Sequence, residues 1–195
     1  TIFAVNQLDL EHANFNTTVE KAKQKFGNAI TVMQYPLNQG TGFNAIIDLL
    51  KMTMYRFPAT GGKPEKLEIP PEEMENAKKL HNELVEKAAE NDEKLMELYF
   101  ERGSLDEDEM KQGLKAGMMA HQIFPVFCLS AKKDMGSGRL MGFIDNVAPS
   151  AIDMPAEIAE DKTLVPCIPT GPTVLFFYKT IIEPHLGKLA FFKVL

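Results

Sequence analysis

Two polar side chains follow the first apolar run of the chain at a spacing suited to ligand recognition. Residues 2–5 are apolar, and Asn6 and Asp9 come shortly after them. The run predicts a strand buried on both faces, as in a parallel sheet, and ligands of open α/β sheets bind just beyond the carboxyl ends of the strands. A carboxylate accepts two parallel N–H bonds, and guanine offers such a pair on one edge. A plain helix cap and turn is the alternative interpretation.

A second apolar run, residues 123–129, ends in another polar segment. It predicts a strand that delivers Ser130, Ala131 and Lys132 to a similar strand end. The two polar segments together make a base-recognition site a better interpretation than either segment alone.

Both segments resemble motifs of GTP-binding proteins. The stretch from Asn6 to Asp9 resembles the Asn-Lys-x-Asp guanine-specificity motif, with Gln7 where lysine is usual, and residues 130–132 resemble the Ser-Ala-Lys motif. Residues 42–52 and 172–195 are similar to the translation elongation factor G family, and the similarity covers essentially the whole chain. The chain is therefore interpreted as an internal fragment of an elongation factor G or of a divergent paralogue.

The resemblance implies roles for these residues. Asp9 would accept the guanine N1 and N2 protons, Asn6 would bond the other edge and brace the loop, and the Ala131 backbone N–H would donate to O6. Ser130 would steady Asp9, and Lys132 would lay its stem over the base.

Gln7 is a departure from the family pattern. The usual lysine packs on the base and ties the motif to the phosphate loop, whereas glutamine lacks its charge and reach. Guanine affinity is therefore expected to be weakened even in the full-length protein.

The motifs that carry phosphoryl transfer are absent from these residues. GTP hydrolysis needs a phosphate loop, Mg²⁺ and a positioned water, but the sequence has no Gly-x-x-x-x-Gly-Lys-Ser/Thr and no Asp-x-x-Gly. The segment 60–64 (Thr-Gly-Gly-Lys-Pro) lacks the Ser/Thr after lysine and predicts a turn. In the family both motifs precede the residue that is Thr1 here. The implied cofactor is GTP or GDP, with Mg²⁺ in the full-length protein and no metal ligands or catalytic residues in this fragment.

Other site chemistries find little support in the sequence. A Ser130/His121/Asp triad has no nucleophile elbow around the serine. Two cysteines far apart, Cys128 and Cys167, predict buried thiols. The histidines have no metal-site spacing: His12, His81, His121 and His185.

Composition and charge limit the partners. The 195 residues are 45% hydrophobic with a formal net charge of −6, which argues against broad nonspecific nucleic-acid binding. No apolar run approaches the length of about 18 residues that spans a membrane, and no signal peptide is visible. We expect a cytoplasmic protein that is a monomer and has no membrane partner.

The predicted fold is α/β: the C-terminal half of a P-loop-type GTPase domain with an inserted α+β subdomain, followed by the first hairpin of a β-barrel. Residues 1–27 and 123–150 are assigned to the GTP-binding domain, 28–122 to the insertion, and 151–195 to a linker and the barrel start.

Hydrophobic periodicity and turn residues predict the individual elements. Helices are expected at 14–26, from Pro71 onward, around 95–99, after Asp106 with a capping box to Glu109, and at 138–147 with Leu140, Met141, Phe143, Ile144 and Val147 buried. Strands are expected at 30–37, 43–57 and 66–69, and a hairpin at 174–182 and 188–195, with loop between 151 and 171.

The predicted helices of the insertion are strongly acidic. Between Pro71 and Glu109 there are fourteen acidic and five basic residues, a balance of −9. Recurrence at three- and four-residue spacing predicts one stripe formed by Glu83, Glu86, Glu90 and Glu93. This stripe is either a solvated surface or a docking face, and the resemblance implies that it contacts the ribosomal stalk protein.

Two functions follow from the resemblance. The first is a GTPase that binds the ribosome and promotes GTP-dependent tRNA–mRNA translocation. The alternative is a divergent paralogue that binds the ribosome with weak or no GTPase activity, which Gln7 favours. Ribosome-protection proteins of tetracycline resistance also resemble this family but have a shorter insertion.

Overall fold

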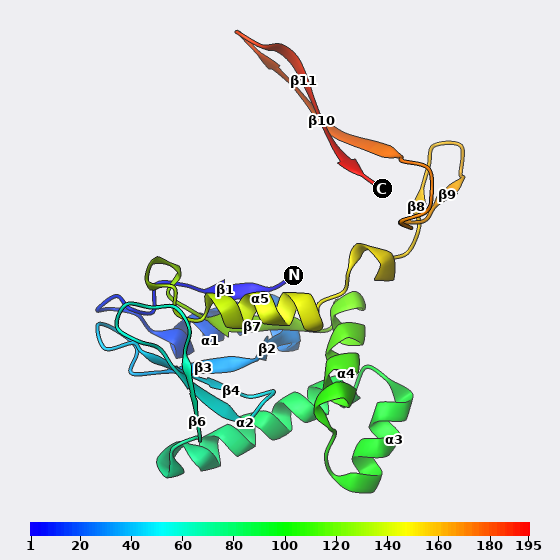
Figure 1. The fold of residues 1–195 in the computed structure, drawn as a ribbon. Coiled ribbons are helices and arrows are strands. Elements are labelled where there is room, and N and C mark those ends of the chain that lie inside the picture. The colour runs from blue at the N-terminus through cyan, green and yellow to red at the C-terminus, as the bar shows by residue number, and fades with distance from the viewer. The chain divides into compact units, whose positions relative to one another are not determined.

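A computed structural model describes residues 1–195, which form two compact units, Thr1–Ala148 and Pro149–Leu195. Figure 1 shows the elements of each unit, coloured along the chain. The fold is mixed α/β, with one parallel sheet and several antiparallel ones.

A three-stranded parallel sheet forms the centre of the first unit. Its order is β1-β7-β2, and the strands are β1 (Phe3–Val5), β7 (Phe124–Cys128) and β2 (Ile30–Val32). The prediction that β1 is buried on both faces was wrong: β1 is an edge strand with one neighbour, and Ala4 is exposed. β2 belongs to this sheet, although the sequence assigned residues 30–32 to the insertion.

Two helices of the first unit follow the predicted positions. α1 (Phe15–Phe26) begins after Asn14, whose side chain accepts a bond from the Thr17 N–H, and ends at Gly27 with φ 68°; both ends are as predicted. α5 (Ser137–Asn146) buries Phe143, but Met141 is 61% and Ile144 42% exposed. The prediction that they are buried was wrong because only one side of α5 packs against the core.

A four-stranded antiparallel sheet follows β2. Its order is β3-β4-β5-β6, with β3 (Gln34–Leu37), β4 (Ala45–Asp48), β5 (Thr53–Arg56) and β6 (Glu65–Leu67). The predicted single strands 30–37 and 43–57 were wrong, because each is two strands. The chain turns after β4, where Asp48 Oδ1 accepts a 3.0 Å bond from the Lys51 N–H and Met52 adopts φ 44°.

Three helices follow in the first unit: α2 (Pro71–Ala89), α3 (Glu93–Arg102) and α4 (Glu107–Met119). The predicted capping box is confirmed, since Asp106 accepts from the Glu109 N–H and Glu109 accepts from the Asp106 N–H. Gly103 ends α3 with φ 70° in the left-handed region, as its position predicted.

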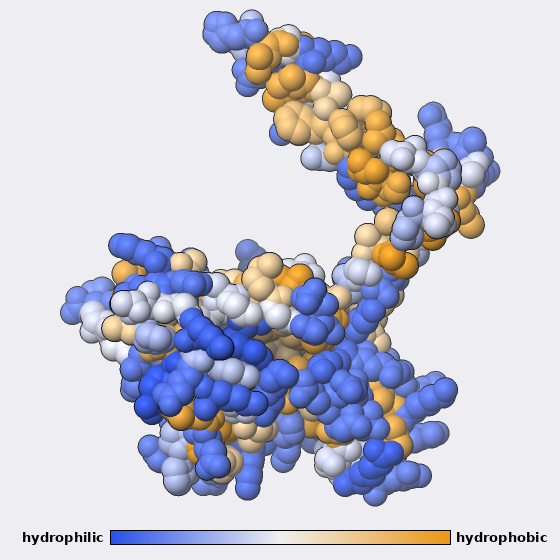
Figure 2. Space-filling model, viewed as in Figure 1, coloured by the Kyte–Doolittle hydropathy of each residue, from blue (hydrophilic) through white to orange (hydrophobic).

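The second unit is a small β structure. It contains β8 (Glu157–Ile158), β9 (Leu164–Val165), and a long hairpin of β10 (Leu175–Glu183) and β11 (Gly187–Val194). The hairpin was predicted, whereas the short β8–β9 pair lies where only loop was expected. Figure 2 shows hydrophobic residues along the surface of the hairpin. None of the helices of the chain is long and apolar enough to cross a membrane.

Candidate functional site

β1 and β7 pair in parallel, so their carboxyl ends lie side by side and bring the two polar segments together. The Leu129 N–H donates to the Val5 carbonyl at 3.0 Å, which joins the strand ends. Beyond them, Asn6 Oδ1 accepts a 2.9 Å bond from the Ala131 N–H and a 2.8 Å bond from the Gln7 N–H. One amide oxygen therefore connects loops whose members lie 125 residues apart.

The Ala131 N–H is the group that the family resemblance predicts will donate to guanine O6. In the structure Ala131 donates to Asn6, so a guanine oxygen would have to share or replace that bond. The Asn6 side chain therefore links the two loops in this structure.

Asp9 lies beside Ser130, as expected. The pKa of the Asp9 carboxyl is lowered, and the largest cause is the Ser130 side chain. The Asp9 backbone and the charges of Lys133 and Lys132 also lower this pKa, whereas burial raises it. Ser130 is fully buried, although its Oγ makes no hydrogen bond of ordinary geometry. Asp9 therefore remains an ionised acceptor at neutral pH.

Lys133 is a site residue that the sequence reasoning missed. Its Nζ lies 3.8 Å from Asp9 Oδ2, and the Asp9 side chain is only 9% exposed. The run of two lysines after Ala131 was the available signal, but only the first was assigned a role. In the structure Lys132 is exposed on the 3₁₀ turn Ala131–Lys133.

Gln7 is exposed and has a left-handed backbone with φ 62°. This conformation is uncommon for residues other than glycine. It turns the chain sharply between Asn6 and Leu8, and Leu8 is buried.

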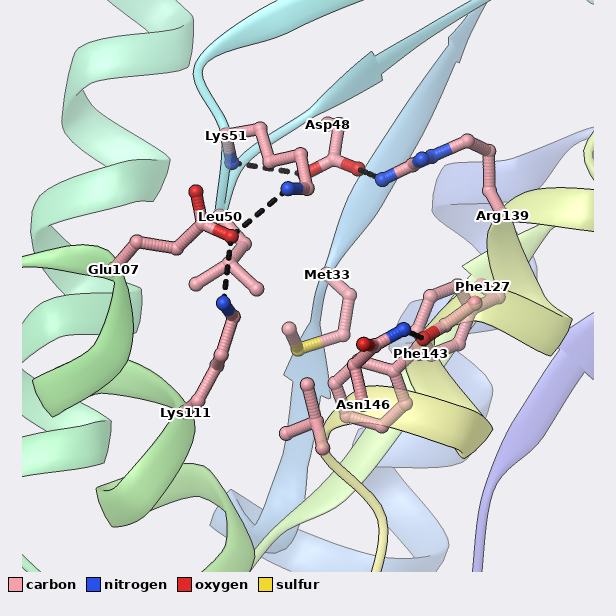
Figure 3. A pocket seen from close by; sticks show the side chains of 12 residues that line it. Met33, Asp48, Leu50, Lys51, Glu107, Lys111, Phe127, Arg139, Phe143 and Asn146 are labelled. Carbon is pink, nitrogen blue, oxygen red and sulfur yellow. Dashed lines mark hydrogen bonds and ion pairs between the residues drawn. The ribbon is translucent and has the colours of Figure 1, made fainter.

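A cavity of about 190 Å³ lies elsewhere in the first unit and contains none of the predicted base-recognition residues. Figure 3 shows that its charged side chains pair with one another. Arg139 donates to Asp48 Oδ2 at 2.8 Å, and Glu107 Oε1 lies 2.8 Å from Lys51 Nζ and 2.9 Å from Lys111 Nζ. These bonds to Lys51 and then Lys111 lower the pKa of Glu107 to about 2.

The acidic side chains of the predicted stripe are all exposed: Glu83, Glu86, Glu90 and Glu93. They do not share one helix, because α2 ends at Ala89 and Glu93 is the first residue of α3. Glu90 still has helical backbone angles, so the stripe continues only from Glu83 to Glu90. The Tyr99 hydroxyl donates to Glu86 at 3.0 Å.

The metal-ligating residue types are not clustered in this chain. No three or more His, Cys, Asp or Glu residues are grouped so that they could hold a metal ion. The candidate site is therefore described by the two loops that carry Asn6, Asp9, Ser130 and Ala131.

Comparisons with known proteins identify a relative over the full length of these residues. No protein-family model matches the chain. Elongation factor G of Mycoplasma pneumoniae is 33% identical over 200 residues, which cover 99% of this chain and 29% of the relative. The chain is a distant homologue of part of elongation factor G.

A solved structure shows the same fold. A crystal structure of a protein from Thermus thermophilus has a TM-score of 0.76 and 21% identity, covering 99% of this chain and 27% of that protein. The chain spans less than a third of the length of each of these two proteins.

Proposed function

We propose that these residues are the base-recognition part of a translational GTPase of the elongation factor G type. The observation that carries the proposal is the meeting of two guanine-type motifs at one sheet edge, bridged by the Asn6–Ala131 bond. On this proposal the chain comprises the C-terminal half of a P-loop-type GTPase domain, an insertion at 28–122 and the first hairpin of a barrel.

The full-length protein would then bind GTP or GDP with Mg²⁺ and hydrolyse GTP in the cytoplasm. Its partners would be the ribosome, with the stalk protein, and the tRNA–mRNA complex, which it would translocate. The relationship to elongation factor G supports this activity, while the phosphate and metal ligands would come from residues outside those described.

The chemistry of the site suits guanine. An ionised Asp9 accepts the N1 and N2 protons as two parallel bonds, and no other standard nucleobase presents this pair of donors at adjacent positions. Asn6 holds the two loops in register. The buried Ser130 hydroxyl and the nearby Lys133 favour the ionised form of Asp9.

Exchanging the acceptor for an amide tests this recognition. Asp9→Asn in the full-length protein should weaken GDP binding by about 100-fold or more, because two charge-assisted bonds of roughly 1.5–3 kcal/mol each are lost. The amide can donate to the 2-oxygen of xanthine, so xanthosine diphosphate should bind more tightly than GDP. Asp145→Asn, an exposed aspartate on α5, is the matched control. Unchanged GDP affinity in Asp9→Asn would contradict the proposal.

The acidic stripe is proposed as the docking face for the ribosomal stalk protein. Glu83→Lys, Glu86→Lys and Glu90→Lys together should slow association and flatten its dependence on salt, because steering by unlike charges acts mainly on the association rate. Glu20→Lys on α1 changes a similarly exposed glutamate outside the stripe. Equal association rates for the triple variant and wild type at low salt would identify the stripe as solvated surface.

Gln7 favours the alternative of a divergent paralogue with weak or no GTPase activity. Gln7→Lys should tighten GDP binding roughly 2- to 13-fold if the base-stacking lysine is the missing element, which corresponds to about 0.5–1.5 kcal/mol. The left-handed backbone at Gln7 applies a similar constraint to either side chain. Weaker binding in Gln7→Lys would show that the loop is adapted to glutamine.

A further inference from the structure

The antiparallel sheet presents two of its connections at the same end. The chain from β3 to β4 (residues 38–44) and the chain from β5 to β6 (residues 57–64) both lie there, because the strands alternate in direction. Each connection contacts a different base-recognition loop.

The first connection holds the loop that carries Asn6 and Asp9. The Gly40 N–H donates to the Leu8 carbonyl at 2.7 Å, and Gln39 Oε1 accepts a 2.8 Å bond from the Phe15 N–H. Leu8 lies between the two recognition residues and is 1% exposed. Its carbonyl is thereby fixed from the side of the antiparallel sheet.

The second connection lies against the loop that follows Ala131. The Gly62 N–H donates to the Asp134 carbonyl at 3.2 Å. Gly61 approaches the loop so closely that a Cβ there would lie 1.8 Å from the Lys133 carbonyl oxygen. Only a residue without a side chain fits this backbone-to-backbone contact.

We propose that Gly61 is a positioning residue for guanine recognition, resting on the function proposed above. Its contact with Lys133 sets how closely the loop 130–134 approaches Asp9, since Lys133 Nζ is 3.8 Å from Asp9 Oδ2 and the Ala131 N–H bonds to Asn6. A side chain at Gly61 pushes this loop away and moves the Ala131 N–H out of reach of the base. Gly61 and Gly62 belong to the segment 60–64, which partly resembles a phosphate loop, but they contact the loop proposed to bind the base.

The test compares Gly61→Ala with Gly62→Ala in the full-length protein. Both glycines have positive φ, 76° and 92°, but a Cβ on Gly62 meets nothing within 4 Å. Gly62→Ala therefore reproduces the backbone strain without the collision. The ligands are GDP and the diphosphate of 2-aminopurine riboside. The 2-aminopurine base lacks the 6-oxygen that the Ala131 N–H would contact and also the N1 proton that Asp9 would accept, and the loss of the N1 proton is common to wild type and both variants.

We expect Gly61→Ala to reduce the preference for GDP over the 2-aminopurine nucleotide about tenfold, the effect of losing one hydrogen bond near the upper end of the usual range. Gly62→Ala should keep the wild-type preference. General destabilisation would weaken both nucleotides equally, so the ratio separates positioning from loss of structure. Wild-type preference in Gly61→Ala, or an equal reduction in both variants, would overturn the inference.

Two further outcomes are distinguishable. A wild-type protein that binds both nucleotides equally would overturn the proposed function itself, and the inference with it. Where Gly61→Ala does not fold, hydrogen exchange of the wild type decides: saturating GDP should slow exchange of the Gly62 N–H, which bonds to Asp134. Unchanged exchange at Gly62 would overturn the inference.

Discussion

The two units of the chain differ in how far their apolar side chains are buried. Every buried hydrophobic side chain lies in the first unit, up to Val147. The hairpin of the second unit leaves large apolar side chains exposed on both strands: Leu175, Phe176, Phe177, Tyr178, Ile182, Phe191, Phe192 and Val194. A single hairpin is only marginally stable in water. The first unit therefore carries the folding free energy, while the second presents a surface that requires covering.

The largest expected contrast is between core truncations in the two units. Leu114→Ala removes a side chain that is 0% exposed on α4, and should lower the free energy of unfolding by about 2–5 kcal/mol through lost burial and the remaining cavity. Ile182→Ala removes one that is 83% exposed on β10, and should change it by less than about 0.5 kcal/mol. Urea denaturation of both variants measures the difference. Comparable losses would mean that the hairpin is packed in solution.

Breaking an ion pair should also lower the free energy of unfolding more in the first unit than in the second, by a smaller amount than the core truncations. The side chains of Asp48 and Arg139 are 10% and 25% exposed, and Arg139 also lies 4.3 Å from the Tyr55 ring centroid. Asp48→Asn should lower the free energy of unfolding by about 1–3 kcal/mol. This is less than for a fully buried pair, because Arg139 retains contact with water.

The matched pair of the second unit is Glu157 with Lys193, whose side chains are 51% and 47% exposed. Glu157→Gln should change the stability by less than about 0.5 kcal/mol. Thermal unfolding of both variants makes the comparison, and an effect of Glu157→Gln as large as that of Asp48→Asn would contradict it.

The smallest of the three expected contrasts between the units is a pH dependence carried by Glu107. Lys51 and then Lys111 lower its pKa from 4.5 to about 2, so its stabilisation is complete above about pH 4.5 and is lost as the pH falls towards 2. Since the side chain is 40% exposed, the contribution is only about 0.3–1 kcal/mol.

Glu107→Gln should therefore reduce the loss of Tm between neutral pH and about pH 3, by removing one titrating group. Asp161 in the second unit also has a lowered pKa, caused first by the Thr163 backbone N–H, and Asp161→Asn serves as the comparison. A change in Asp161→Asn larger than that in Glu107→Gln would place the acid sensitivity in the second unit.

Local signals in the sequence were sufficient to predict most helices, and to predict that the segments at Asn6 and at Ser130 each follow a strand. Asn14, Gly27 and the pair Asp106 and Glu109 mark helix ends through bonds within a few residues. The runs before Asn6 and Ser130 predicted strands with polar groups at their ends, and the parallel pairing of β1 and β7 brought those ends together.

The errors occurred where a turn lacks glycine and proline, or where distant parts of the chain decide the outcome. The turn between β4 and β5 contains no glycine or proline, and it depends on the Asp48 side chain and on Met52 in a left-handed conformation. Met33 separates β2 from β3 by donating to the Val126 carbonyl and accepting from the Leu49 N–H. The close approach of Gly61 to Lys133 joins residues far apart in the sequence, and no local pattern reveals it.

The pairing of β1 with β7 also has a consequence for synthesis of the protein. The bond from Ala131 to Asn6 spans 125 residues, and β1 has β7 as its one strand partner here. At a translation rate of about 5–20 residues per second, the first loop waits roughly 6–25 s for its partner to be made. During that interval the Asn6–Ala131 bond cannot form, so the two loops meet only after residue 131 has been synthesised.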